Sequence, residues 1–266
     1  MNYSKAHYFL IALLAITIVA FWPSYFGILE SASVAHHLHG VTGTLWILLI
    51  ASQNYLAHSG SINLHRKLGK LMFVLVPAMV GAFALVTFDG AVKSKALNPF
   101  YLEFGQALLT VDVMLTFAIP FTLYLALRYR QQVQLHSALM ISSVIGLLSP
   151  ILARFYNNII PGWEVTGPDT LYRFGYGLHT SMVSALLIAL ALYFCYRPRS
   201  WPWMLAVLIT GVYYVAYLTL GRTEFWQQLV YLLAEAQPVG IFIFGAVLGA
   251  LACGLGWKAG VTKVKP

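Results

Sequence analysis

The sequence predicts an all-α protein, a bundle of transmembrane helices that crosses a bilayer about eight times with both termini in the cytoplasm. Three observations predict this fold. Apolar residues make up 60% of the 266 residues, charged residues make up only 9%, and the apolar residues gather in eight long runs. Soluble domains carry roughly a quarter of charged residues. A chain so poor in charge could not cover a soluble surface, so lipid must be its main solvent.

The eight apolar runs follow one another along the whole chain, and each is close to the length of about 20 residues that a span requires. We find no linker and no internal repeat, so residues 1–266 are predicted to form a single integral membrane domain. The runs cover residues 6–28, 34–57, 64–88, 100–127, 135–156, 170–196, 201–220 and 238–257.

The segment 222–237, between the last two runs, differs from a span. It places Phe225, Leu229 and Leu232 at helical spacing with Gln and Glu between them. Such a pattern predicts a helix that lies on the outer membrane surface.

The distribution of charge predicts the orientation. With the N-terminus in the cytoplasm, most Lys and Arg residues fall on the inner side and the acidic residues fall at the outer face, as the positive-inside rule expects. The net charge of +8 is scattered over the ends of the apolar runs and forms no basic patch. This argues against nucleic acid as a partner and favours the lipid bilayer with its anionic headgroups.

The outer side of the predicted bundle carries an unusual set of polar residues. His36 and His39 share one helix face, whereas His37 points about 100° away. His179 and Asp112 lie about 13 Å and about 18 Å deep at 1.5 Å per residue, a depth at which ionisable groups tend to be functional. These five residues could form an outward-facing metal site, in which zinc would activate a water. The alternative for the three histidines at residues 36–39 is a solvated helix end without a metal. The alternative for Asp112 and His179 is a hydrogen bond that is only structural.

The inner side carries a second group, because His65 and His136 each open a run there. With His36, His39 and His179 at the outer face, they form two imidazole sets near opposite faces. A di-haem b-type cytochrome needs this arrangement, since each iron takes one histidine from each of two facing helices. The predicted haem pairs are His36 or His39 with His179, and His65 with His136. The alternative is that the inner residues are ordinary interfacial histidines.

Two motifs resemble elements of the di-haem b cytochromes that pass electrons from ascorbate across membranes. They are His39-Gly40 followed by Trp46, and His65-x-x-x-Gly69. The resemblance covers the second and third runs and implies haem b and electron transfer. In that family the two elements lie two spans apart, whereas here they open consecutive spans at opposite faces. The longer pattern H-x-H-G…W…Q…H-R-x-L-G also resembles a broad set of bacterial multi-span proteins, which implies the bacterial inner membrane and no particular activity.

A third resemblance concerns the intramembrane metal hydrolases of the ceramidase and progestin-receptor type. Ser33-x-x-x-His37 is similar to their first motif. Their closing His-x-x-x-His on a late span is missing here, since no histidine follows His179.

Three functions therefore stay open. The first is electron transfer through b-type haem, with quinone or another redox protein as the partner. The second is a metal-dependent enzyme with an outward-facing His/Asp site. The third is a non-catalytic transporter or assembly factor, in which the polar groups form a permeation path or packing contacts.

Other residues are interpreted as structural. His7 and His58 are expected at headgroup level, and Arg154 is expected to pair with Glu103 near the outer face. The stripe Gly245-x-x-x-Gly249 allows close helix contact, either within the monomer or across a homodimer.

Overall fold

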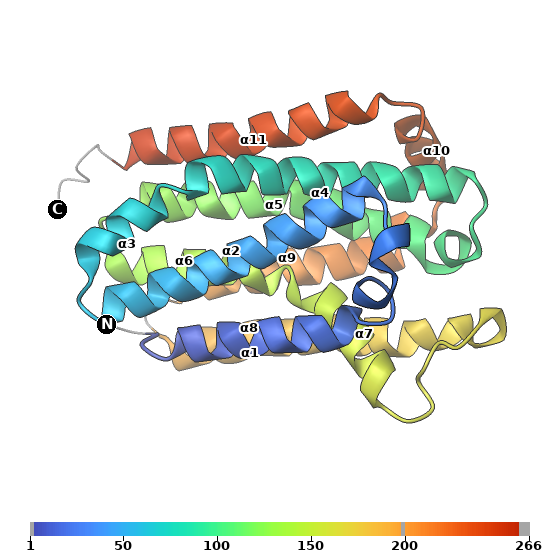
Figure 1. The fold of residues 1–266 in the computed structure, drawn as a ribbon, viewed down its shortest axis with the longest axis horizontal. Coiled ribbons are helices and arrows are strands. Elements are labelled where there is room, and N and C mark those ends of the chain that lie inside the picture. Colours follow the sequence, from blue (N-terminus) through green and yellow to red (C-terminus); the bar gives the residue numbers. More distant parts are fainter. Residues whose placement is uncertain (1–2, 198–199, 261–266) are drawn as a thin grey trace.

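The computed structural model describes residues 3–197 and 200–260, and every regular element in these ranges is helical (Figure 1). The longer helices run roughly side by side along the long axis of the molecule. Six of them are long and apolar enough to cross a membrane, which confirms the expectation of a multi-pass helical membrane protein. They are α2 (Val34–His58), α4 (Met72–Lys95), α5 (Gln106–Arg128), α8 (Phe174–Cys195), α9 (Trp201–Leu218) and α11 (Pro238–Ala259). Three of them are extended by a turn of another helix type. The π-helical turn Tyr101–Gly105 precedes α5, the 3-10 turn Pro168–Arg173 precedes α8, and the 3-10 turn Leu220–Arg222 follows α9.

The first apolar run forms a shorter helix than the sequence predicts. Helix α1 (Ala6–Phe21) has 16 residues, which span about 24 Å at 1.5 Å per residue against a hydrocarbon core of about 30 Å. Pro23 follows, and its missing N–H cannot continue the helical hydrogen bonds. A 3-10 turn at Phe26–Ser31 then leads into α2.

The third run is divided, which corrects the prediction that it begins at residue 64. A separate short helix, α3 (Ile62–Gly69), carries the polar sequence around His65, and α4 starts only at Met72. His65 therefore lies on a connecting helix and does not open a span. The concentration of charge in residues 65–70 explains the division, because these residues favour the interface over the apolar interior.

The fifth run is broken into two helices. Helices α6 (Val133–Ile145) and α7 (Leu148–Ile159) meet at an angle of 45°. Pro150 has no N–H to donate to the carbonyl of Gly146, so the hydrogen-bond ladder is interrupted at this point. Counted together, the two helices are a seventh candidate span.

Helix α10 (Glu224–Leu233) lies within the predicted segment 222–237. Trp226 and Val230 face the protein and pack on Ala91 and Leu109. The predicted apolar face points the other way, and its residues are exposed: Phe225, Leu229 and Leu232.

The glycine stripe of α11 is packed within the chain. A Cβ atom on Gly245 would lie 2.6 Å from the carbonyl oxygen of Val80, and one on Gly249 would lie 2.9 Å from Cα of Pro77. Both contacts are with the backbone of α4, so the two helices approach as closely as small residues allow. The stripe is therefore covered by α4 and does not present a free surface for a homodimer.

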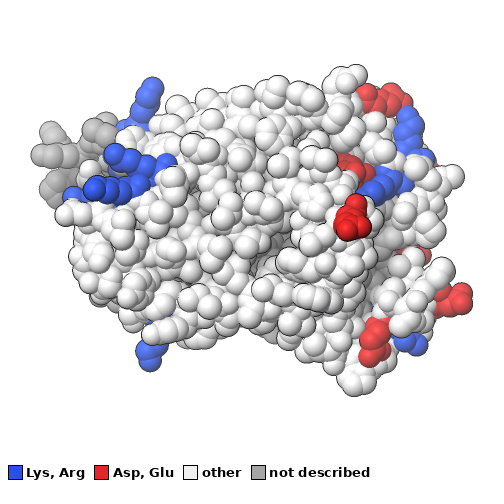
Figure 2. Space-filling model, in the orientation of Figure 1, with Lys and Arg blue, Asp and Glu red and all other residues white. Residues whose placement is uncertain are grey.

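Charged side chains gather at the two ends of the bundle, and the surface between them is free of charge on the face drawn (Figure 2). Lys and Arg lie at the end that holds α3, and the acidic residues lie at the opposite end with some basic residues. At that opposite end, Lys95 reaches Glu235 at 2.7 Å. Because Lys95 donates a hydrogen bond to it, the pKa of the Glu235 carboxyl lies below its usual value.

Candidate functional site

The start of α2 is organised by Ser33, which is its N-cap. The Ser33 hydroxyl accepts a hydrogen bond from the backbone N–H of His36 and lies 2.7 Å from Nδ1 of the same residue. The same Nδ1 lies 3.5 Å from Oδ2 of Asp89, which Lys93 contacts at 2.7 Å. His36 therefore joins α2 to an ion pair on α4 that the sequence analysis did not single out. The i, i+4 spacing of Asp89 and Lys93 was the available signal.

His37 points to a different neighbour, as its angular offset from His36 predicts. Its Nδ1 lies 2.8 Å from the hydroxyl of Tyr25, in the connection that precedes α2. The contact between Tyr25 and His37 holds the segment before α2 against the helix. His37 is thus separated from the surface that His36 and His39 share.

His39 lies one turn further into α2 than His36 and faces the bundle. Its ring packs on Phe83 of α4 with 4.5 Å between ring centroids. Its Nδ1 is buried and has no hydrogen-bond partner among the described residues. A buried polar atom without a partner is costly, which makes this nitrogen a candidate to bind a water or a ligand.

Arg154, on α7, lies against two aromatic rings. Its guanidinium carbon is 4.7 Å from the ring centroid of Phe21 and 5.9 Å from that of Phe174. One of its donors reaches the carbonyl of Pro150 at 3.1 Å. No carboxylate of the described residues lies within ion-pair distance of it.

Two ionisable side chains act electrostatically on Arg154. It is within electrostatic range of Asp112 on α5 and of Tyr101 in the π-helical turn. The expected pair with Glu103 is therefore wrong, and the carbonyl of Glu103 instead accepts a hydrogen bond from Arg222. We call His36, His39, Tyr101, Asp112 and Arg154 the outer site.

His179, on α8, has its own set of neighbours. Its Nδ1 lies 3.1 Å from the hydroxyl of Tyr214, and its ring centroid is 5.8 Å from that of Tyr217. Both tyrosines belong to α9. In the part of the chain that the structure describes, no hydrogen bond or ion pair joins His179 to Asp112 or to the histidines of α2.

The described residues contain no group of three or more His, Cys, Asp or Glu side chains arranged to hold a metal ion. The five residues of the predicted metal site have different neighbours. His37 contacts Tyr25, His179 contacts Tyr214, and the other three are His36, His39 and Asp112 of the outer site.

At the end of the bundle that holds α3, the structure brings His65 and His136 to one cavity and adds a third histidine, His58. The cavity has a volume of about 50 Å³ and lies between α2, α3 and α6, with Gln53 and Met140 also in its wall. We call it the inner histidine cavity. His58 is the last residue of α2, and its part in this cavity is additional to the headgroup-level position expected for it. The spacing of His58 and His65 across a short polar turn was the signal that could have found it.

The three imidazoles of this cavity are held in the same way. Nδ1 of His58 lies 2.8 Å from the carbonyl of Asn54, that of His65 lies 3.3 Å from the carbonyl of Gln53, and that of His136 lies 2.8 Å from the carbonyl of Ala126. A carbonyl oxygen only accepts, so each Nδ1 is the donor. In the neutral imidazole, each Nε2 is then the acceptor nitrogen. The Nε2 of His58 is buried without a partner among the described residues.

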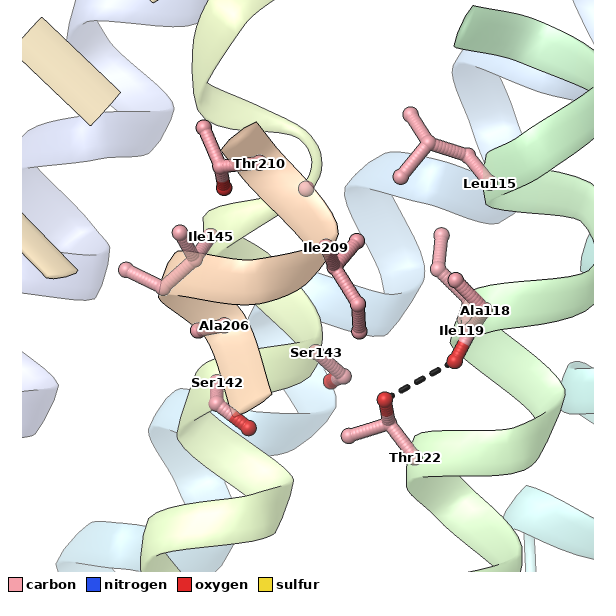
Figure 3. A pocket seen from close by; sticks show the side chains of 11 residues that line it. Leu115, Ala118, Ile119, Thr122, Ser142, Ser143, Ile145, Ala206, Ile209 and Thr210 are labelled. Carbon is pink, nitrogen blue, oxygen red and sulfur yellow. Dashed lines mark hydrogen bonds between the residues drawn. The ribbon is translucent and has the colours of Figure 1, made fainter. Parts of the chain in front are cut away.

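Polar side chains also lie between the two ends. The indole N–H of Trp46 on α2 donates to the hydroxyl of Ser143 on α6 at 3.1 Å. Beside Ser143 is a cavity of about 10 Å³, around which residues of α5, α6 and α9 gather, including Thr122 (Figure 3). This volume corresponds to about one water molecule.

Comparison of the chain with protein-family models, with curated proteins and with solved structures gives no match.

Proposed function

We propose that this protein is a transporter of the bacterial inner membrane, in which a solute moves between the outer site and the inner histidine cavity. One observation carries the proposal. The broken crossing α6–α7 contributes a residue to each site, Arg154 to the outer site and His136 to the inner cavity, with Ser143 between them. Interrupted helices of this kind form the central binding regions of many secondary transporters.

Helix α2 supports the same path from the opposite wall. It carries His36 and His39 at its outer end, Trp46 in the middle and His58 at its inner end. The Trp46–Ser143 hydrogen bond joins the two walls halfway. Polar groups placed along two facing elements at membrane depth are costly unless they serve a path or a site.

The topology proposed for the transporter has eight crossings and both termini in the cytoplasm. The crossings are the six long helices, the broken pair and α1. The charge distribution supports this orientation, because the end that holds α3 carries the Lys and Arg residues seen in Figure 2. The outer site then faces away from the cytoplasm and the inner histidine cavity faces it.

Electron transfer through haem b is a second candidate, favoured by the way His65 and His136 are held. An Nδ1–H bonded to a carbonyl leaves Nε2 ready to ligate iron. The cavity does not fit the group, however, because a cofactor of this size needs a pocket of several hundred Å³ and the inner cavity has about 50 Å³. A Soret absorption band in the purified protein would favour this candidate over transport.

The transport proposal is tested by the water access of Ser143. We expect the Ser143→Cys thiol to react with a small membrane-impermeant methanethiosulfonate reagent added to membrane vesicles, because a solute path must admit water at its midpoint. The background is a Cys195→Ser chain, since Cys195 is exposed whereas Cys253 is buried. Labelling is measured by the mass of the purified protein.

The matched control is Ser181→Cys on α8, a serine that is also fully buried and lies outside the path. It should stay unmodified under the same conditions. If Ser143→Cys reacts no faster than Ser181→Cys from either side of the membrane, the proposed path is absent and a packing or assembly role is favoured.

A further inference from the structure

The small cavity beside Ser143 lies where α6 ends, between α5, α6 and α9 (Figure 3). Its volume of about 10 Å³ matches one water-sized body. Four hydroxyl side chains line it, Thr122 from α5, Ser142 and Ser143 from α6, and Thr210 from α9. We call it the break cavity, because its wall also contains Gly146, the residue at which α6 stops.

Three of these hydroxyl groups are restricted to accepting. Those of Thr122, Ser142 and Ser143 each donate their proton to a backbone carbonyl three or four residues earlier, at 2.8, 3.0 and 2.7 Å. A hydroxyl group has one proton, so each of these oxygens can offer only lone pairs to a ligand.

Thr210 provides a polar atom without a partner. The residue is 1% exposed, and its Oγ1 forms no hydrogen bond with any of the described residues. The hydroxyl of Tyr213, one turn along α9, is bonded to that of Ser149 at 2.8 Å. A buried polar atom without a partner is costly, so the Thr210 hydroxyl indicates a bound species in the break cavity.

The break between α6 and α7 frees two backbone carbonyls in residues of this wall. In a continuous α-helix the carbonyl of Ser143 would accept from the N–H of Leu147, but this N–H donates to the carbonyl of Val144 at 3.0 Å. The carbonyl of Gly146 would accept from Pro150, which has no N–H. Both carbonyls belong to the C-terminal end of α6, where the helix dipole is negative.

These groups together favour a small cation over a water molecule. A water has two protons and cannot satisfy every acceptor of the wall, whereas a cation can be bound by several oxygens at once. No carboxylate is found among the described residues that line the cavity, so a divalent ion, which usually takes acidic ligands in proteins, is a poor match. Unwound carbonyls and the C-terminal ends of half-helices bind sodium in secondary transporters, and sodium fits the small volume better than the larger potassium ion.

We propose that the break cavity binds a sodium ion through Thr122, Thr210 and the freed carbonyls of Ser143 and Gly146, and that this ion drives the movement of the solute. The second part rests on the proposed function, because an ion can drive transport only where a path exists. Bound sodium joins α5, α6 and α9 at the break, so it stabilises the folded protein.

The test uses the full-length protein purified in detergent and measures its thermal unfolding midpoint during a titration with sodium chloride. Choline chloride keeps the ionic strength constant, so that screening does not change. We expect sodium to raise the midpoint in a saturable way and potassium to have little effect. The proposal is overturned if potassium is as effective as sodium, or if neither ion differs from choline, in which case the cavity holds a water.

Threonine-to-valine variants locate the binding, because valine has nearly the same shape and lacks the oxygen. Thr210→Val removes an atom that has no partner, so the variant is expected to fold. It should weaken sodium binding at least about tenfold, the effect of losing one contact with a charged group, and Thr122→Val should do the same.

The matched control is Thr87→Val on α4. Thr87 is also buried and donates to a carbonyl of its own helix, at 2.9 Å, but it lies outside the break cavity. This variant should keep the sodium affinity of the unmodified protein. A Thr210→Val variant with unchanged affinity, or a Thr87→Val variant weakened to the same extent, would overturn the assignment of the site.

This result is separable from the test of transport. Sodium binding in detergent does not require a path, and labelling at Ser143 does not require sodium. If Ser143→Cys is labelled but sodium does not bind, the path stands and the proposed ion is wrong. If sodium binds but Ser143→Cys stays unmodified, the cavity is a structural cation site and the ion drives no transport.

Discussion

Replacement of Trp46 by alanine is expected to lower the free energy of unfolding by about 4 kcal/mol, within the range of about 3–5 kcal/mol for large aromatic side chains lost from a core. Trp46 is completely buried. Its indole also donates the hydrogen bond that joins α2 to α6 at Ser143. The variant would therefore lose apolar contacts and leave a void between the two walls of the proposed path. Unfolding in mixed micelles with increasing SDS measures the change.

A matched control separates burial from residue type. Trp22, which is 60% exposed, should tolerate alanine with a change within about 0.5 kcal/mol. Ser143→Ala should fall between the two variants, because it leaves a buried indole N–H without its acceptor, at a cost of about 1–3 kcal/mol. A Trp46→Ala variant as stable as the Trp22→Ala variant would contradict the packing of α2 against the broken crossing.

The second large decrease in the free energy of unfolding is expected for a substitution at Arg154. Arg154→Gln removes the cation that offsets Asp112 in the interior and should destabilise the protein by about 2–3 kcal/mol, less than a directly paired buried charge would cost. Asp112→Asn should destabilise it for the corresponding reason. The double variant should be more stable than the sum of the two single changes implies, since it leaves no isolated charge.

A double-mutant cycle measured by the same unfolding assay gives the coupling between the two residues, expected at about 1–2 kcal/mol. The pair Arg154 and Glu103 supplies the control cycle, because Asp112 is among the charges that act on Arg154 in the described structure and Glu103 is not. Equal coupling in both cycles would contradict the arrangement of the outer site.

The sequence was sufficient to predict the helical membrane fold. Composition and run length alone placed the last two spans, 201–220 and 238–257, within a few residues of α9 and α11, because a span of uniform apolar residues has no competing local signal. The breaks were harder to predict. Gly146 and Pro150 lie inside an apolar run, and hydropathy does not register the hydrogen bond that proline removes.

The grouping of polar residues was predicted less well, for a physical reason. Depth along straight helices placed Asp112 beside His179, but depth does not say which helices are neighbours. In the structure α8 presents His179 to Tyr214 of α9, whereas Arg154 on α7 lies against Phe21 and Phe174. His65 and His136 line one cavity, although His65 lies on the connecting helix α3 and does not open a span as the sequence predicts. His58 was missed because its position near a turn suggested solvent, and the turn of α3 back toward α2 could not be read from the pattern.

The central claim is that the outer site and the inner histidine cavity lie at opposite faces of the membrane. Sided thiol labelling tests it most directly, with one accessible cysteine added to the Cys195→Ser chain, in which the remaining Cys253 is buried. The two positions are Thr166, in the exposed loop after α7, and Ser59, in the exposed turn after α2. In intact cells with a permeable outer envelope, we expect an impermeant maleimide to label Thr166→Cys at once and Ser59→Cys only after the membrane is permeabilised. Labelling of both positions from the same side would contradict the claim.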